Sequence, residues 1–217
     1  MQSFATARHN MVESQIRTNK VTDPAVIGAF SELPRERFVP EGLRGVAYID
    51  EELELTHDRF LMEPMVLARL VQIAAPKLQD IALDVGCGTG YASAVLARLC
   101  SAVVALESDR GLIARANALF DELQINNVVV AEGALTEGYK RQAPYNVILL
   151  NGTVERIPQA LFDQLAEGGR LVTIHIDGGV GRGSLYLKSA GIVSRRPIFD
   201  AATPLLPGFR AEPHFVF

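Results

Sequence analysis

The chain has 217 residues, of which 48% are hydrophobic and 21% charged, and its formal net charge is −4. These fractions are typical of a globular protein and exclude an intrinsically disordered one. The length lies between one and two domains at roughly 150 residues per domain, so one enlarged domain is expected. Because acidic residues outnumber basic ones, the composition gives no general electrostatic reason to bind nucleic acid.

The cysteines and histidines predict neither a disulfide framework nor a metal site. Cys87 and Cys100 are too few for a four-thiolate zinc site, and they suit a reducing compartment. The histidines lie far apart in the chain, without HxH or HxxxH spacing, at positions 9, 57, 175 and 214. The sequence has no run of about 18 apolar residues and no signal-peptide core near its start. We therefore expect a cytoplasmic protein with no membrane partner, as a monomer or weak homodimer.

Helical patterns dominate the first 75 residues. Apolar residues recur at helical spacing over residues 4–16 and predict an amphipathic helix. Thr22 is expected to cap a second helix, with Pro24 in its first turn, that ends before Pro34. A third helix is predicted over residues 64–74, because proline is favoured at the first helical position. Residues 1–75 are thus expected to form a helical extension and residues 76–217 the core.

From about residue 80, short apolar runs alternate with helical segments. The runs predict strands over residues 81–85, 102–107, 127–132, 146–151 and 170–176. The segments between them predict helices over residues 91–100, 108–123 and 158–169, the last ended by glycine. This alternation predicts an α/β fold with a doubly wound, mostly parallel, Rossmann-like sheet. The proline-broken tail from residue 184, including residues 214–217, suits antiparallel edge strands.

A glycine-rich loop, LDVGCGTGY (83–91), follows the first core strand and opens the next helix. Gly86, Gly88 and Gly90 let the backbone approach a ligand closely. The dinucleotide fingerprint would need glycine where Tyr91 stands. Asp84 would repel a pyrophosphate but attract a sulfonium and an ammonium group. The loop therefore favours S-adenosylmethionine over NAD.

Carboxylates end the next two strands. Glu107 lies at the position where a carboxylate accepts hydrogen bonds from both ribose hydroxyls of a nucleotide cofactor. Glu132 and Gly133 end the third strand, near where an adenine amino group would need an acceptor. Cys87 lies in the glycine loop without a histidine nearby in the sequence, and it is interpreted as a small filler rather than a reactive thiol.

The chain resembles the protein-L-isoaspartate O-methyltransferases, a family of class I S-adenosylmethionine-dependent methyltransferases. LDVGCGTG is similar to the first motif of the class, and the segments that follow the order of the family include LPRERFVP (33–40), AYIDEEL (47–53), EPMVLARL (63–70) and NVVVAEG (127–133). The resemblance implies a seven-stranded sheet, methyl transfer to a carboxylate of damaged protein in protein repair, and isoaspartyl protein as the partner. It implies cofactor contacts from Asp84, Gly86, Cys87, Gly88, Gly90, Tyr91, Glu107, Ser108, Glu132, Gly133 and Asn151.

The acceptor site departs from the family pattern. The family carries Thr-Ile-Ser before the proline of the third helix, where this chain has Phe60, Leu61 and Met62. Asp58 and Arg59 replace the usual Gly-Gln, and Arg59 either attracts the acceptor's carboxylate or is a solvated loop residue. Transfer to a carboxylate needs no general base, so the protein supplies positioning and desolvation.

No catalytic residue is assigned from the sequence, although Arg59 and Asn151 are candidates near the Met62 position. Three hypotheses stay open: an isoaspartyl methyltransferase, a methyltransferase with a more apolar acceptor, and a non-catalytic module that binds the cofactor. An NAD-dependent oxidoreductase is a distant alternative, disfavoured by Tyr91 and Asp84.

Overall fold

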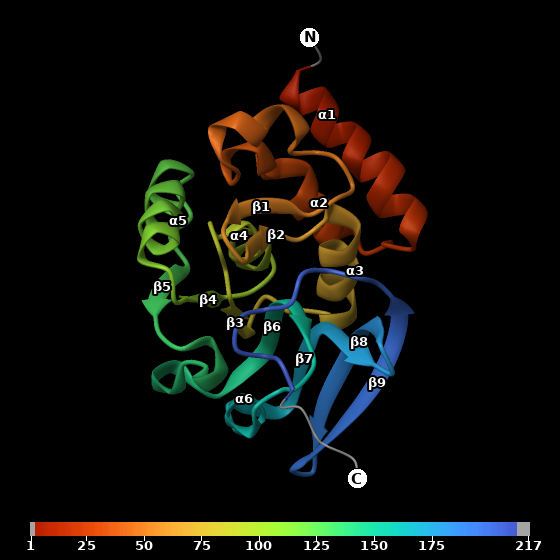
Figure 1. Ribbon diagram of the computed structural model, residues 1–217, viewed down its shortest axis with the longest axis vertical. Coiled ribbons are helices and arrows are strands. Elements are labelled where there is room, and N and C mark those ends of the chain that lie inside the picture. The colour runs from red at the N-terminus through yellow and green to blue at the C-terminus, as the bar shows by residue number, and fades with distance from the viewer. Residues whose placement is uncertain (1–2, 212–217) are drawn as a thin grey trace.

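A seven-stranded sheet forms the centre of the computed structural model, which describes residues 3–211 (Figure 1). The strand order is β5-β4-β3-β6-β7-β8-β9. The first five strands in this order are parallel, and the β7–β8 and β8–β9 pairs are antiparallel. The bounds are β3 (Ile81–Val85), β4 (Ala102–Glu107), β5 (Val128–Glu132), β6 (Tyr145–Val154), β7 (Leu165–Asp177), β8 (Val180–Ser189) and β9 (Ile192–Asp200). The mostly parallel sheet and the antiparallel tail strands are therefore confirmed, whereas the tail residues 214–217 lie outside the described residues.

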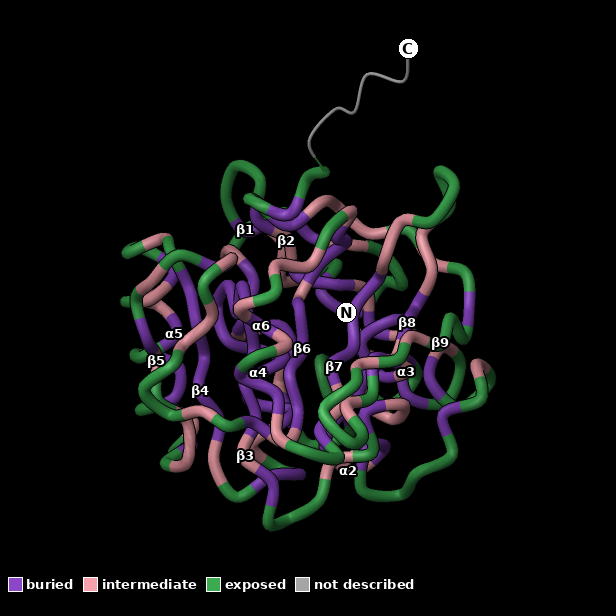
Figure 2. The backbone as a smooth tube through the Cα atoms, turned by 90° about the horizontal axis from the view of Figure 1, so that it is seen from below, coloured by how far each residue is buried: buried purple, intermediate pink, exposed green. Residues whose placement is uncertain are grey.

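The order of the strands determines where a site can form. The chain runs outward from β3 through β4 to β5 and then returns to place β6 on the other side of β3. In such sheets, ligands bind beyond the carboxyl ends of the strands at the point where the order reverses. Strands β3 and β4 are continuous apolar runs buried on both faces, as Figure 2 shows for most of the sheet. Their last residues thus carry the polar groups of this edge.

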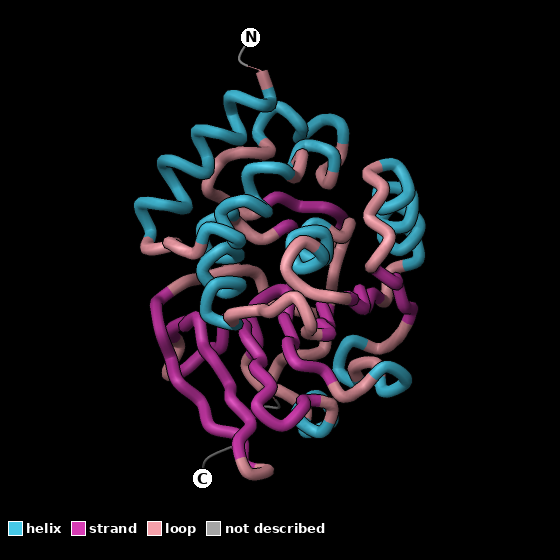
Figure 3. The backbone as a smooth tube through the Cα atoms, turned by 180° about the vertical axis from the view of Figure 1, so that it is seen from behind, coloured by secondary structure: helices cyan, strands magenta, loops and turns pink. Residues whose placement is uncertain are grey.

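Helices cover the sheet on both faces, and the first two helices of the extension lie beyond one end of it, while its third helix packs against β7 and β8 (Figure 3). Their bounds are α1 (Phe4–Met11), α2 (Pro24–Glu32), α3 (Pro64–Ala74), α4 (Tyr91–Ala97), α5 (Arg110–Glu122) and α6 (Gln159–Asp163). The first predicted helix continues past α1 as a π-helical segment, Val12–Ile16. Buried side chains of the extension, among them Met11, Phe30 and Leu67, share one apolar cluster with core residues such as Val172. Within residues 3–211, no helix combines the length and apolar character that crossing a membrane requires.

Several predicted helix boundaries were wrong, including that of α4, which ends at Ala97 and not at residue 100. Asp23, and not Thr22, caps α2, because its carboxylate accepts hydrogen bonds from the N–H groups of Ala25 at 2.8 Å and Val26 at 3.2 Å. Pro24 is the first residue of α2 and favours an extended residue before it, which places Asp23 at the cap.

The helix predicted over residues 158–169 is shorter, since α6 ends at Asp163. The Gln164 amide donates to the carbonyl of Ala160 at 2.7 Å and to that of Glu137 at 2.8 Å. Leu165 then pairs with Tyr145 as the first residue of β7, so sheet pairing begins before the glycines are reached.

Two segments that differ from the prediction lie at the carboxyl edge of the sheet. A hairpin there was not predicted, and residues 201–209, expected in the antiparallel edge strands, form only a single parallel bridge from Leu205 to Thr153. Strands β1 (Leu53–Thr56) and β2 (Arg59–Leu61) form an antiparallel hairpin that, among residues 3–211, pairs with no other strand. Residues 201–209 return from β9 and cross in front of β6, drawn in blue in Figure 1. The Thr153 N–H donates to the Pro204 carbonyl at 2.9 Å, and the Leu206 N–H donates to the Thr153 carbonyl at 2.8 Å. Both segments cover the edge at which the polar strand ends gather.

Candidate functional site

The glycine loop turns sharply between β3 and α4. Gly86 and Gly90 have φ values of +79° and +92°, a region that favours glycine. A Cβ at Gly90 would lie 2.4 Å from the Phe120 ring. The N–H groups of Gly86 and Cys87 both donate to the Leu106 carbonyl, at 2.9 and 3.1 Å, which ties the loop to β4. The backbone therefore forms a tight cradle at the carboxyl edge of the sheet.

Asp84 is fully buried in the penultimate position of β3. Its carboxylate accepts hydrogen bonds from the Ser93 hydroxyl at 2.6 Å and from the Asn151 amide at 3.3 Å. Burial raises the pKa of Asp84 from 3.8 to about 7, against the opposing effect of these hydrogen bonds. The group can thus change its charge near neutral pH.

Glu107, the last residue of β4, is also fully buried. Its carboxylate accepts hydrogen bonds from the N–H groups of Gly88 at 2.8 Å, Ser108 at 2.8 Å and Asp109 at 3.2 Å. The Arg59 guanidinium forms an ion pair with the same carboxylate. Four close donors, three of them from the backbone, and the Ser108 hydroxyl at 3.3 Å therefore converge on one strand-end carboxylate.

Arg59 is buried, and this finding excludes the interpretation of a solvated loop arginine. Its side chain is 8% exposed and reaches from β2 into the glycine cradle. A Cβ built on Gly86 would lie 3.0 Å from the Arg59 Nη2 atom and 2.7 Å from Leu206 Cδ1. The guanidinium and the Leu206 side chain therefore fill the space directly above Gly86.

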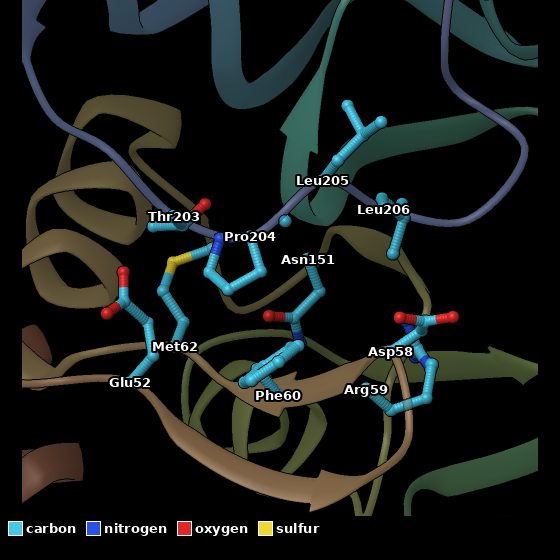
Figure 4. Close-up of a pocket in the computed structure, with 11 residues that line it drawn as sticks. Glu52, Asp58, Arg59, Phe60, Met62, Asn151, Thr203, Pro204, Leu205 and Leu206 are labelled. Carbon is cyan, nitrogen blue, oxygen red and sulfur yellow. The ribbon is translucent and has the colours of Figure 1, made fainter.

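A small cavity lies beside this ion pair (Figure 4). Its volume is about 10 Å³, far below the roughly 300–1,000 Å³ of most small-molecule sites. It is lined by the hairpin, by β6 and by the C-terminal segment, through Glu52, Asp58, Arg59, Phe60, Met62, Asn151, Gly152 and residues 203–206. The apolar replacements at Phe60 and Met62 thus face the same space as Asn151.

The remaining predicted site residues lie apart from this cavity. The Tyr91 ring packs edge-on against Phe30 and Phe38 of the extension, with centroid distances of 6.0 and 5.3 Å. Glu132 is exposed and pairs with Arg110 at 2.8 Å. These placements give Tyr91 a packing role between the extension and α4, and they leave Glu132 at the outer part of the edge.

Other predicted residues support the cradle through the backbone or by filling space. The Gly133 N–H donates to the Glu107 carbonyl at 3.1 Å, which links β5 to β4. Cys87 is buried, and burial raises the pKa of its thiol, as suits a small filler residue. The C-terminal residues 203–206 had no signal in the sequence except the prolines at 204 and 207, which indicate irregular backbone without showing where it folds.

The chemical groups at this edge of the sheet fit the cofactor expected from the sequence. The glycine cradle excludes side chains, Glu107 offers a buried carboxylate to hydroxyl groups, and Asp84 offers a second acid to a cation. Arg59 and Leu206 occupy part of the same space. Within residues 3–211, no group of three or more His, Cys, Asp or Glu side chains is arranged to hold a metal ion.

Comparisons with known proteins agree with one another. The family model described as protein-L-isoaspartate(D-aspartate) O-methyltransferase matches residues 6–187. A protein-L-isoaspartate O-methyltransferase of Desulfosudis oleivorans is 37% identical over 169 residues, which cover 78% of this chain and 76% of that protein. One of Opitutus terrae is 35% identical over 208 residues, covering 95% and 88%.

Solved structures share the fold. A protein-L-isoaspartate O-methyltransferase superimposes with a TM-score of 0.80 at 24% identity, covering 93% of this chain and 66% of that one. A Plasmodium falciparum structure, described as a putative protein-L-isoaspartate O-methyltransferase in complex with S-adenosyl-L-homocysteine, gives a TM-score of 0.79 at 18% identity and covers 95% and 99%.

Proposed function

The chain belongs to the protein-L-isoaspartate(D-aspartate) O-methyltransferase family, and from this premise we propose that it transfers a methyl group from S-adenosylmethionine to a carboxylate of damaged protein. The observation that carries the proposal is the pairing of the glycine cradle after β3 with the buried Glu107 carboxylate at the end of β4. This arrangement matches what a nucleoside with a cationic amino-acid tail requires.

Each part of the edge has a proposed partner in the cofactor. Asp84 and the loop from Gly86 to Gly90 hold the methionine moiety, and Glu107, supported by the Ser108 N–H, holds the ribose. Glu132 and Gly133 lie on the adenine side, and Tyr91 supports the loop from behind. Asn151 lines the reaction centre, where it already contacts Asp84 and faces the cavity.

Methyl transfer to a carboxylate needs no general acid or base from the protein. The cofactor supplies a methyl group activated by its sulfonium, and a carboxylate is already a charged nucleophile. The side chains of the cavity therefore need only to orient the acceptor and exclude water. Asn151 offers an amide for orientation, while Phe60 and Met62 lower the polarity of the cavity.

The extension and the hairpin form the proposed acceptor side. We assign residues 1–75 to a cap over the core because β2 and the segment up to Pro64 supply the cavity residues Arg59, Phe60 and Met62. The loss of the family's serine at Met62 favours an acceptor whose surroundings are more apolar than the usual isoaspartyl site. A methyltransferase with such an acceptor is the second candidate function.

An assay with labelled S-adenosylmethionine tests the proposal. An isoaspartyl peptide is expected to accept label, while its aspartyl isomer of otherwise identical sequence does not. Incorporation into neither peptide at high enzyme concentration, with cofactor binding shown by calorimetry, would remove the isoaspartyl substrate and favour the apolar acceptor. Absence of both labelling and cofactor binding would contradict the methyltransferase proposal itself.

A further inference from the structure

We infer that Arg59 is an internal competitor of the cofactor: its guanidinium holds the Glu107 carboxylate until the ribose hydroxyls replace it. The inference rests on the proposed S-adenosylmethionine site and adds to it a residue that determines cofactor affinity. It starts from the buried Arg59–Glu107 ion pair, which connects the hairpin to the strand end proposed to bind the ribose.

The hydrogen-bonding capacity of the Glu107 carboxylate is filled in the structure. A carboxylate offers about four lone-pair sites. In the structure these meet the Arg59 guanidinium and the N–H groups of Gly88, Ser108 and Asp109, with the Ser108 hydroxyl as a longer contact at 3.3 Å. The backbone donors belong to the cradle and to the turn after β4. Of these four close donors Arg59 is the side chain, and its departure frees one lone-pair site of Glu107 for a ribose hydroxyl.

The space above Gly86 is filled by the side chains of Arg59 and Leu206. The Arg59 Nη2 and Nη1 atoms lie 3.0 and 3.3 Å from the position of a Gly86 Cβ, and Leu206 Cδ1 lies 2.7 Å from it. A glycine cradle binds a ligand through this face, so the side chain and the ligand cannot share it. Arg59 and Leu206 must both withdraw for the cofactor to bind.

The buried acids of the site need a positive charge nearby. Asp84 and Glu107 are two buried acids, and the Arg59 guanidinium forms an ion pair with Glu107 and exerts a coulombic effect on Asp84. Removing one member of a buried pair without replacement is costly. A sulfonium cofactor brings a positive charge of its own, so exchanging it for the guanidinium keeps the two acids compensated.

The Arg59 guanidinium is incompletely hydrogen-bonded in its buried position. Its Nε atom is buried and has no hydrogen-bond partner among the described residues. The neighbouring turn contains Asp58 at a φ of +61°, and the side chains of His57 and Asp58 are 94% and 70% exposed. In the described part of the chain, the hairpin pairs with no other strand. The closed position is therefore held mainly by the Glu107 pair.

Calorimetric titration with S-adenosylmethionine tests the exchange. Arg59→Gln is expected to bind the cofactor at least about tenfold more tightly than the wild type, because an occluded state populated at about 90% lowers apparent affinity tenfold. Arg59→Lys keeps the cation beside Glu107 and is expected to stay near the wild-type affinity. Arg37→Gln, which removes an exposed pair with Glu122, is the matched control and should bind as the wild type does.

A second variant tests the same competition in case Arg59→Gln does not fold. Leu206→Ala clears the other obstruction above Gly86 without touching the ion pair, and it is expected to tighten binding severalfold. Circular dichroism and thermal unfolding verify that both variants fold, and the cofactor should raise the Tm of Arg59→Gln more than that of the wild type.

The outcomes separate this inference from the function on which it rests. Equal or weaker binding by a folded Arg59→Gln variant, with measurable binding by the wild type, would overturn the competition and leave the cofactor site in place. Failure of wild type and both variants to bind at millimolar cofactor would overturn the proposed function and the exchange with it.

Discussion

Asn151 of β6 donates a hydrogen bond of 3.3 Å to the buried carboxylate of Asp84 in β3. The contact joins the two strands between which the sheet order reverses. It also places an ionisable acid, a neutral amide and the proposed reaction cavity next to one another. The charge of Asp84 therefore connects the stability of the sheet edge to the binding of a cationic ligand.

The first prediction concerns the pH dependence of stability. The pKa of Asp84 is raised by burial from 3.8 to about 7 in the folded protein. The protonated form is thus favoured by folding, so its stabilising effect is complete below about pH 4 and lost as pH rises to about 7. Wild type is expected to lose up to about 4 kcal/mol relative to Asp84→Asn over this range. Urea unfolding of both proteins from pH 4 to 8 measures the difference, and parallel curves would contradict it.

The second prediction concerns cofactor affinity and pH. A bound cation favours ionised Asp84, so S-adenosylmethionine binding should release a proton and tighten as pH rises from about 6 to about 8. Burial also raises the pKa of Glu63 to about 7, so this group must be separated from Asp84. Calorimetry in buffers of different ionisation enthalpy should show proton release in Glu63→Gln but not in Asp84→Asn. The reverse assignment would contradict the role of Asp84.

The third prediction concerns Glu107. Glu107→Gln is expected to weaken cofactor binding by an order of magnitude or more, because a ribose acceptor is lost. It should also destabilise the fold by about 3–5 kcal/mol, since Arg59 stays buried without its partner. The double variant Glu107→Gln with Arg59→Gln should recover part of that stability, as expected for two residues in contact. Glu122→Gln removes an exposed pair and serves as the control. Unchanged affinity in Glu107→Gln would refute the ribose assignment.

The sheet could be predicted from the sequence because its signals are local. Continuous apolar runs predicted residues 81–85 and 102–107 as strands, and the structure has β3 and β4 with these bounds. The glycine loop could be recognised for the same reason, since its turn depends on residues within the motif. The cap of α2 was misplaced by one residue because Thr22 and Asp23 can both accept a helix N–H, and only the position of Pro24 decides between them.

The closed state of the site could not be predicted in this way. Arg59 and Glu107 are 48 residues apart in the sequence, and nothing near either residue indicates that they meet. The same holds for Leu206, which reaches Gly86 only because residues 201–209 pair with the Thr153 backbone. Such contacts depend on tertiary packing of two irregular segments, which carry no periodic pattern.

The fourth prediction concerns the acceptor cavity. Met62 is buried and lines the cavity at the position of the family's serine. Replacement of residues 60–62 by Thr-Ile-Ser is expected to raise methyl transfer to an isoaspartyl peptide by about 10–100-fold, as one restored hydrogen bond of roughly 1–3 kcal/mol would provide. Met62→Ser alone should give part of the gain, at a stability cost of about 2–4 kcal/mol for a large buried side chain. A folded variant that binds cofactor without any gain would show that the acceptor differs from an isoaspartyl carboxylate.

The fifth prediction concerns Arg35, which supports the cavity from the extension. Its buried guanidinium donates to the carbonyls of Ala47 at 2.7 Å and Met62 at 2.9 Å and lies 5.0 Å from the centre of the Tyr91 ring. Lysine cannot reproduce this planar fork, so one carbonyl should lose its partner in Arg35→Lys. We expect a loss of about 2–4 kcal/mol in the free energy of unfolding.

Methyl transfer by Arg35→Lys should fall further than cofactor affinity, because the Met62 backbone belongs to the proposed acceptor side and not to the glycine cradle. Arg37→Lys changes an exposed side chain two residues away and is expected to cost less than about 0.5 kcal/mol. Denaturant unfolding and cofactor titration of both variants separate the two effects. Equal losses in Arg35→Lys and Arg37→Lys would show that the Met62 carbonyl does not depend on Arg35, whereas a selective loss of transfer would identify Arg35 as a positioning residue.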